Sequence, residues 1–306
     1  MSAHVTAEIA GQPDCWRRAA ALADRLPRPG ERVAVVGCGT SYLMARSYAA
    51  LRESLGAGET DAFPASEPTP LGRGYDRIVA LTRSGTTTEV VDLLAAAAGR
   101  RPTLVLTGVP GSPAARLADR VVDLSFADER SVVQTRFATT ALQLLRAGMG
   151  VDLAPSVADA ELALYEPLPP AWERRSQFTF LGTGWTVGIA DEAALKLREA
   201  ARAWTESYPA MEYRHGPISV SDRAGLVWCV GPVPAGLREE VESTGALFTA
   251  DAVDPVAALV RAQRLAVALA DRRGLNPDRP RNVSRSVILA GAFRPTAADA
   301  ARILRA

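Results

Sequence analysis

A carboxylate, an amine and an imidazole that could together move protons lie in one short segment of the chain. Lys196 is the single lysine among 35 lysine and arginine residues, and His215 is one of only two histidines. Glu192, Lys196 and Glu199 stand at positions i, i+4 and i+7, which places all three side chains on one face of a helix. A carboxylate beside an acidic C–H bond and a group that titrates near neutrality can share proton transfer. This segment is therefore the candidate for catalytic chemistry.

Simpler structural interpretations exist for the same residues. Glu192 and Lys196 can form an exposed ion pair, which contributes only about 0.2–0.5 kcal/mol on a helix surface. Arginine would serve such a pair equally well, and this chain uses arginine for every other cationic side chain. The lysine retained here therefore indicates a specific role. For His215 alone, a buried or turn position held by the backbone is the alternative.

Two hydroxyl-rich turns follow apolar runs in the first half of the chain. Residues 33–36 form a β-branched run typical of a strand buried on both faces, and Gly37-Cys-Gly-Thr-Ser41 follows it. Residues 78–81 form a second run, which is followed by Thr82-Arg-Ser-Gly-Thr-Thr-Thr-Glu89. Each turn leads into a helical pattern, so its backbone N–H groups and hydroxyls can bind an anion. Turns at consecutive strand ends line the crevice at the carboxyl edge of a parallel sheet, where ligands of open α/β folds bind.

Two other interpretations of these turns are helix capping and dinucleotide binding. Thr87 or Thr88 can simply be the N-cap of the following helix, although capping does not explain two hydroxyl-rich turns. A dinucleotide is disfavoured, because Tyr42 occupies the position of the third glycine in the dinucleotide fingerprint. The sequence also contains no Walker A motif.

The segment around Lys196 resembles the second half of the sugar isomerase (SIS) domain pair of the glucosamine-6-phosphate synthase family. That family carries E-x-A-L-K-L-x-E followed at the same distance by H-G-P, as this chain does from Glu192 to Pro217. The resemblance implies that Glu199 is the base that moves a proton between C1 and C2, with Lys196 beside it. It also implies that His215 assists ring opening and reaches in from the neighbouring subunit of a homodimer.

The first half extends the resemblance. T-x-S-G-x-T resembles the phosphate-binding loop of the family, with Arg83 in place of the usual glutamine, where it can add a cation to the phosphate site or point into solvent. The segment from Asp128 to Thr140 resembles a family helix start in which Glu129 contacts the sugar, although a charge near a helix N-terminus is the simpler interpretation of Glu129. The residues thus expected at the sugar phosphate are Gly39, Thr40, Ser41, Thr82, Arg83, Ser84, Thr87, Glu129, Val132 and Arg285.

The tail from Asn276 to Val287 resembles the family segment that folds over the bound sugar, with one departure. The family carries there a lysine that forms an imine with the ketose, and this chain has Arg285. A guanidinium stays protonated at any useful pH, so it cannot act as an amine nucleophile. We therefore expect no imine at position 285.

Composition limits the classes of partner. The net charge is +1 and the arginines are scattered, which disfavours nucleic acid. No run is long and apolar enough for a membrane span and no leader pattern is present, so we expect a cytoplasmic protein. Three separated cysteines and two histidines suggest neither disulfides nor a zinc site. We expect no metal and no organic cofactor.

An internal repeat organises the chain. A strand running into G-x-G-x-[ST] occurs at residues 33–41 and again at 178–186, and further strands are predicted at 103–107, 120–124 and 226–230. The alternation with helices predicts an α/β fold of two tandem doubly wound parallel-sheet domains, flavodoxin-like as in the SIS family. We expect an N-terminal helical segment at 1–29 with a helix at 14–26, SIS domains at 30–150 and 176–292, a linker at 151–175 and a terminal segment at 293–306. The second copy lacks the hydroxyl loop, so one phosphate site per chain is expected.

These observations predict a phosphosugar isomerase or deaminase acting on a hexose or hexosamine 6-phosphate through an enediol or enolamine. No glutaminase sequence precedes the SIS pattern, so glutamine amidotransfer by this chain is not expected. The alternative is a non-catalytic phosphosugar sensor, which would have no need for the pair of Glu199 and His215.

Overall fold

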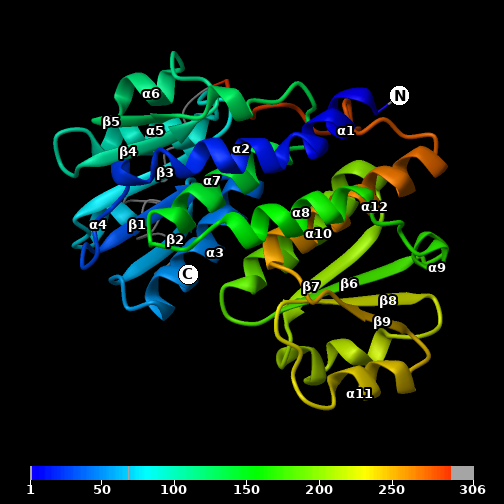
Figure 1. Ribbon diagram of the computed structural model, residues 1–306. Coiled ribbons are helices and arrows are strands. Elements are labelled where there is room, and N and C mark those ends of the chain that lie inside the picture. The colour runs from blue at the N-terminus through cyan, green and yellow to red at the C-terminus, as the bar shows by residue number, and fades with distance from the viewer. Residues whose placement is uncertain (1, 68, 291–306) are drawn as a thin grey trace, which may run out of the picture.

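The computed structural model describes residues 2–67 and 69–290, and it contains two parallel β-sheets flanked by helices (Figure 1). The chain is an α/β protein in which each half of the sequence forms one sheet. Short 3-10 turns connect several elements: η1 (Ala23–Arg25), η2 (Ser125–Ala127), η3 (Glu212–Arg214) and η4 (Pro217–Val220). No helix in the described part of the chain is both long and apolar enough to cross a membrane.

The first sheet has the strand order β2-β1-β3-β4-β5, and every pair is parallel. Its strands are β1 (Val33–Gly37), β2 (Thr60–Pro64), β3 (Arg77–Thr82), β4 (Thr103–Thr107) and β5 (Arg120–Asp123). Its helices are α3 (Thr40–Ser54), α4 (Thr69–Gly72), α5 (Thr88–Ala97), α6 (Pro113–Leu117) and α7 (Arg136–Ala147). Because β1 pairs directly with β3, the two hydroxyl-rich turns that follow these strands lie side by side.

The second sheet repeats this arrangement with four strands in the order β7-β6-β8-β9, again all parallel. Its strands are β6 (Gln177–Gly182), β7 (Trp204–Pro209), β8 (Gly225–Val230) and β9 (Leu247–Ala250). Its helices are α10 (Thr186–Ala201), α11 (Leu237–Ser243) and α12 (Pro255–Arg272). The six strands predicted from apolar runs are confirmed, and the predicted charged stripe lies on α10.

The repeated glycine at the end of β1 and β6 has a steric cause. A Cβ on Gly37 would lie 2.7 Å from the backbone of Ser41, and one on Gly182 would lie 2.4 Å from the carbonyl oxygen of Thr186. Real Cβ atoms do not approach backbone this closely, so only glycine lets the strand turn directly into its helix. The internal repeat is therefore a repeat of backbone geometry.

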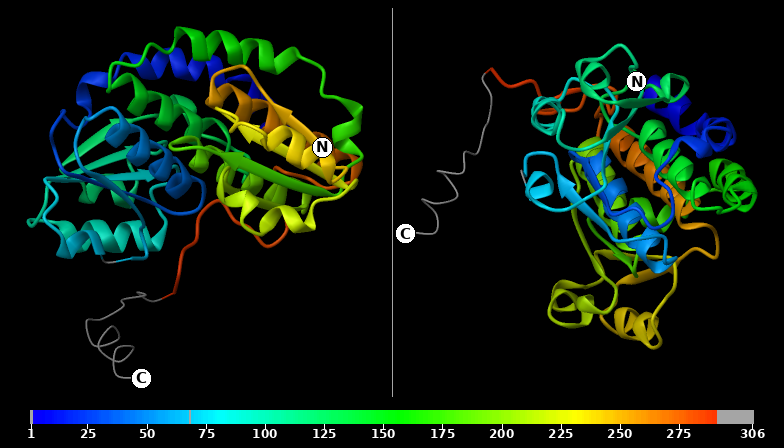
Figure 2. Two further views of the ribbon diagram at one scale, coloured as in Figure 1. Left: turned by 90° about the horizontal axis from the view of Figure 1, so that it is seen from below. Right: turned by 90° about the vertical axis from the view of Figure 1, so that its left-hand side faces the viewer.

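The two halves meet where α10 crosses α3, and α12 packs on the other side of α10 (Figures 1 and 2). A Cβ on Gly188 of α10 would lie 2.6 Å from the carbonyl oxygen of Leu43 on α3, so a glycine permits the close crossing. α8 (Ala154–Tyr165) packs on α12 and on α2 (Gln12–Ala20), and α1 (Ala3–Ala10) also contacts α12. The remaining short helix is α9 (Pro170–Glu173).

The N-terminal helix differs from the prediction of one helix at residues 14–26. Two helices, α1 and α2, are present instead, and α2 ends at Ala20. Pro13 stands in the first turn of α2, where a missing N–H costs nothing, so the helix starts earlier than the periodicity suggested. The terminal segment expected at 293–306 lies outside the described residues.

Candidate functional site

A cavity opens at the carboxyl edge of the first sheet, beside the start of α3 and α5. The two hydroxyl-rich turns, the segment before α7, the side of α10 and the C-terminal tail all contribute to it. The residues that line it are Cys38, Gly39, Thr40, Ser41, Leu81, Thr82, Arg83, Ser84, Thr87, Val90, Val132, Gln134, Glu199, Val283, Ser284, Arg285, Ser286 and Val287. The structure thus brings together Glu199 from the second half and the hydroxyl turns from the first.

The loop after β3 is arranged to donate hydrogen bonds into this cavity. The Thr82 hydroxyl accepts from the backbone N–H of Gly85 at 3.2 Å, and the Ser84 hydroxyl accepts from the N–H of Thr86 at 3.2 Å. Neither hydroxyl donates to a described residue, so each hydroxyl hydrogen remains available to an anion. Thr87 is the N-cap of α5, yet its side chain makes no capping hydrogen bond. Capping alone therefore does not account for the hydroxyls of this loop.

The corresponding turn in the second half is built differently. The Thr186 hydroxyl accepts from the N–H of Thr183 at 2.8 Å and donates to the carbonyl of Val230 at 2.7 Å. Both of its hydrogen-bonding functions are spent on the fold, and the side chain is buried. This repeat closes a turn and leaves no hydroxyl hydrogen for a ligand.

Lys196 is buried between the two halves and holds Glu199 in place. Its ammonium donates to the Glu199 carboxylate at 2.5 Å and to the hydroxyl of Thr40 at 2.9 Å, and it lies 3.3 Å from Glu192. The side chains of Lys196 and Glu192 are 1% and 0% exposed. The surface ion pair that was the alternative for these residues is therefore wrong, because the charged face of α10 packs inside the molecule. Thr40 comes from α3, so the cluster joins the catalytic candidate to the anion-binding turn.

Burial dominates the electrostatics of this cluster. Loss of solvation raises the pKa of Glu192 to about 8, against the lowering effect of the Lys196 charge. Both Glu192 oxygens lack a hydrogen bond of good geometry in the described part of the protein, although Lys196 is near. The pKa of Lys196 is raised, because its two carboxylate neighbours outweigh the desolvation that lowers it. Lys196 thus stays cationic, and Glu199 is the carboxylate that it holds by a direct hydrogen bond.

His215 does not line the cavity of its own chain. It follows η3 with an exposed side chain, and its backbone N–H bonds the carbonyl of Glu212 at 2.9 Å. This exposure excludes a buried histidine, whereas the other form of the alternative, a turn position held by the backbone, is what the single chain shows. In a single chain, therefore, the imidazole and Glu199 are not neighbours at the cavity.

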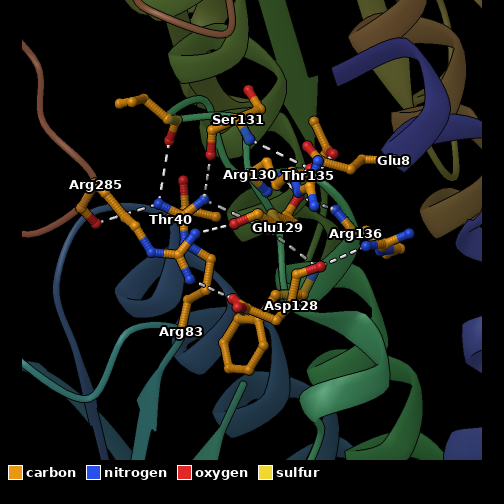
Figure 3. Close-up of polar contacts among 12 residues, drawn as sticks. Glu8, Thr40, Arg83, Asp128, Glu129, Arg130, Ser131, Thr135, Arg136 and Arg285 are labelled. Atoms are coloured by element: carbon orange, nitrogen blue, oxygen red, sulfur yellow. Dashed lines mark hydrogen bonds and ion pairs between the residues drawn. The ribbon is translucent and has the colours of Figure 1, made fainter. Parts of the chain in front are cut away.

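Glu129 corrects the expectation of a sugar contact. Its side chain is fully buried and does not line the cavity. One carboxylate oxygen accepts from the N–H groups of Thr135 and Arg136, each at 2.7 Å, and from the Thr135 hydroxyl at 2.9 Å (Figure 3). These are donors at the N-terminus of α7, where a negative charge is stabilised by the helix dipole. The simpler interpretation of Glu129 as a charge at a helix start is the one that the structure shows.

Replacing Glu129 with glutamine should destabilise the protein by about 1–3 kcal/mol, because buried charge-assisted hydrogen bonds from four donors are weakened. Urea unfolding followed by circular dichroism measures the loss. Glu161→Gln, at a side chain that is 49% exposed, is the control and should change stability by less than about 0.5 kcal/mol. Equal stability of the two variants would contradict the capping role.

Arg83 lies in the wall of the cavity and does not point into solvent, which was one of its two expected orientations. It is 4% exposed and donates to the carbonyl oxygens of Ser131 at 3.0 Å, Val132 at 3.3 Å and Arg285 at 3.2 Å (Figure 3). Its guanidinium also lies 3.6 Å from Glu129. Arg83 therefore connects the segment before α7 and the tail to the loop after β3, which we call the phosphate-type loop. Its buried Nε has no partner among the described residues.

Arg285 anchors the tail over the cavity by its side chain. The guanidinium donates to the Asp128 carboxylate at 2.5 Å and to the carbonyl oxygen of Glu129. The neighbouring Ser286 hydroxyl accepts from the Thr86 hydroxyl at 2.9 Å, and Thr88 N–H donates to the carbonyl of Val287 at 3.1 Å. The tail thus runs across the N-terminus of α5, as Figure 2 shows for the orange and red trace.

Sequence reasoning missed several lining residues. Cys38, Gln134, Ser284, Ser286 and Val287 line the cavity, although none was named as a site residue. The three tail residues belong to the segment that was expected over the sugar. Cys38 lies within the first glycine turn, Gly37-Cys-Gly-Thr-Ser41, so this motif could have identified it as a cavity residue. Gln134 carries no such signal, because it belongs to no motif and only the folded segment brings it to the cavity.

Comparison with known proteins places these features in a family. Residues 28–147 match the family described as SIS domain. The chain is 30% identical over 307 residues to the glutamine–fructose-6-phosphate aminotransferase (isomerizing) of Methanothermobacter thermautotrophicus, with 84% of this chain and 51% of that protein covered. The chain therefore spans about half the length of the curated relatives that it matches.

Solved structures show the same fold at lower identity. The glucosamine-6-phosphate deaminase of Thermotoga maritima superposes with a TM-score of 0.77 at 24% identity, covering 93% of this chain and 99% of that one. The tagatose-6-phosphate ketose/aldose isomerase of Escherichia coli has a TM-score of 0.74 at 18% identity, covering 95% and 97%. Residues 28–147, with the hydroxyl turns of the cavity, are thus a SIS domain, and the chain shares the fold of these solved structures.

Proposed function

We propose that this protein is an enzyme that moves a proton between C1 and C2 of a hexose or hexosamine 6-phosphate. The loop hydroxyls of Thr82, Ser84 and Thr87, with Ser41, hold the phosphate, and Glu199 is the base. The intermediate is an enediol or, with a 2-amino group, an enolamine. The phosphate-binding hydroxyls and the base come from two doubly wound SIS-type domains, at about residues 30–150 and 176–292 respectively.

One observation carries this proposal: Glu199 lines the same cavity as the hydroxyl donors of the phosphate-type loop. Lys196 fixes the Glu199 carboxylate at 2.5 Å and reaches Thr40 of the first half at 2.9 Å. A base held in a cavity with an anion site is suited to a substrate that carries a phosphate at one end and an acidic C–H bond at the other. Isomerase and deaminase names among structures of the same fold are consistent with it.

Two substrates separate isomerisation from deamination. Glucosamine 6-phosphate alone, and fructose 6-phosphate with added ammonia, are incubated with the purified protein while ketose, aldose and free ammonia are measured. Ammonia released from glucosamine 6-phosphate identifies a deaminase, since an imine formed by tautomerisation is hydrolysed by water. Interconversion of glucose and fructose 6-phosphates without nitrogen transfer identifies an isomerase. We propose that glutamine does not serve as nitrogen donor for this chain.

His215 enters this proposal through a homodimer with shared active sites. In the single chain the imidazole is exposed and outside the cavity, and the nearby side chains of Met211 and Val220 are 51% and 54% exposed. Exposed apolar side chains close to His215 in the sequence suit contact with a second copy, whose cavity would receive His215 as the ring-opening group.

Mixing two inactive variants should restore activity if the sites are shared. In dimers formed from equal amounts of Glu199→Gln and His215→Asn chains, about a quarter of all sites contain both intact groups. The activity of the refolded mixture, compared with each variant refolded alone, measures this recovery. A monomer in solution, or mixed dimers without recovered activity, would contradict the shared site.

The second candidate is a phosphosugar sensor without catalysis, since the phosphate-type loop alone would suffice for it. The buried support of Glu199 by Lys196 favours the enzyme, because a sensor needs no oriented base. Saturable sugar-phosphate binding without any proton exchange would favour the sensor.

A further inference from the structure

The N-terminal helix α1 carries a buried carboxylate that the proposed reaction does not use. Glu8 is 5% exposed and does not line the cavity. Its Oε1 atom accepts from the backbone N–H groups of Arg130 at 2.6 Å and of Ser131 at 3.2 Å (Figure 3). α1 lies outside residues 28–147, which match the SIS domain, yet through Glu8 it holds the segment that lines the cavity at Val132.

The phosphate-type loop holds the same segment from its other side. Arg83 donates to the carbonyl oxygens of Ser131 at 3.0 Å and of Val132 at 3.3 Å. The buried Ser131 is therefore bound by Glu8 through its N–H and by Arg83 through its carbonyl. Two hydrogen bonds thus connect α1 to the loop that is proposed to hold phosphate, so a shift of this segment would also displace Arg83.

The N-terminus of α1 binds the start of the tail. The Asp278 carboxylate accepts from the N–H groups of His4 at 3.0 Å and of Val5 at 2.8 Å. N–H groups in the first turn of a helix have no partner inside it, and the helix dipole favours a negative charge there. The backbone carbonyl of Asp278 accepts from the N–H of Val132 at 3.2 Å. α1 therefore fixes the tail and the segment before α7 relative to each other, and both line the cavity further along.

We propose that Glu8 is a positioning residue for sugar-phosphate binding, so that α1 supports the site although none of its residues lines the cavity. The inference rests on the proposed function and deepens it, because it gives the N-terminal helix a part in holding the substrate. Without the Glu8 acceptor two backbone N–H groups lose their partner, and the segment before α7 relaxes to satisfy them. A ligand then binds only the fraction of molecules that keep the original arrangement, which weakens its apparent affinity.

Two substitutions of Glu8 in the full chain test this role by calorimetry. Glu8→Met keeps the length of the side chain and removes the acceptor, so glucosamine 6-phosphate should bind about tenfold or more weakly. Glu8→Gln keeps the acceptor oxygen, and its new amide group displaces no hydrogen bond, because the other Glu8 oxygen has no partner among the described residues. Burial and the nearby Glu129 also raise the pKa of Glu8, so loss of its charge costs little. Glu8→Gln should therefore bind within about threefold of wild type.

Ser2→Ala is the matched control at the start of the same helix. The Ser2 hydroxyl donates to Asp271 of α12 at 3.2 Å, and among the described residues it bonds neither the segment before α7 nor the tail. The variant removes a contact of α1 without touching the proposed connection, so its affinity for glucosamine 6-phosphate should stay within about threefold of wild type. Equal losses of affinity in Ser2→Ala and Glu8→Met would overturn the assignment, because any loosening of α1 would then have the same effect.

Hydrogen exchange of α1 in the wild-type protein tests the connection without a substitution. A short terminal helix exchanges by local opening, and a ligand that does not contact it slows this exchange only when opening and binding are coupled. Saturating glucosamine 6-phosphate should slow exchange in a peptide that covers residues 3–10 by about tenfold, whereas exchange in α8 should stay unchanged. Unchanged exchange of residues 3–10 would overturn the positioning role, even if Glu8→Met did not fold.

These measurements separate the inference from the proposed reaction. Failure of glucosamine 6-phosphate, fructose 6-phosphate and inorganic phosphate to bind would overturn both. Weaker binding by Glu8→Met, with no proton exchange by the wild-type protein, would support the positioning role and overturn only the catalytic proposal. Proton exchange by the wild-type protein, with unchanged affinity in a folded Glu8→Met, would overturn only the positioning role.

Discussion

Replacing Glu199 with glutamine is expected to lower turnover by about 10²–10⁴-fold while leaving sugar-phosphate affinity within about threefold of wild type. The amide keeps the size of the side chain but cannot accept the substrate proton. The loop hydroxyls that are proposed to hold phosphate are on other elements and keep their hydrogen bonds. Steady-state kinetics for both candidate reactions, with calorimetry for binding, measure the two effects separately.

Glu161→Gln is the control, since Glu161 is an exposed residue of α8 that pairs with Arg17 of α2. Its kinetic constants should equal those of the wild-type protein. If Glu199→Gln retained full turnover, the base would have to be another group. If it lost binding and turnover together, Glu199 would be a ligand contact in place of a base.

The second large effect is expected from Lys196→Met, which should destabilise the protein by about 3–5 kcal/mol. The substitution leaves the Glu199 carboxylate, whose side chain is 19% exposed, without the ammonium that donates to it at 2.5 Å. It also removes the hydrogen bond to Thr40 that joins α10 to the first half. Urea unfolding at pH 7 measures the change in the free energy of unfolding.

A paired variant identifies the cause of this destabilisation. In Glu199→Gln/Lys196→Met the charge of the carboxylate is removed together with its partner, so the double variant should be more stable than Lys196→Met alone. If the double variant were as unstable as the single one, loss of packing would be the cause. A destabilisation by Lys196→Met below about 1 kcal/mol would contradict the buried cluster itself.

Central strands were predictable and several edge strands were not. β1, β3, β6 and β8 lie inside their sheets, and continuous apolar runs identify them because both faces are buried. β7 and β9 lie at edges and carry partly exposed residues, so no apolar run marks them. The sequence predicted that the hydroxyl turns line one crevice, but the pairing of β1 with β3 that brings them together is known only from the structure.

The site was predictable where a motif places residues by backbone geometry. The turn after β1 and the loop after β3 meet at the cavity as expected, since strand ends fix their position. Glu129 was misassigned because the donors that it binds, in Thr135 and Arg136, become available only when α7 forms. Burial of the α10 charges likewise depends on α3 and α12 packing against that helix, which spacing alone does not reveal.

The central claim is that Glu199 exchanges a carbon-bound proton of a bound sugar phosphate with solvent. The most direct test incubates the wild-type protein in deuterium oxide with fructose 6-phosphate and with glucosamine 6-phosphate, and follows C1 and C2 by nuclear magnetic resonance. Deuterium should appear at C1 or C2 with the wild-type protein and not with Glu199→Gln. Saturable binding of both sugar phosphates without carbon-bound deuterium would contradict the account.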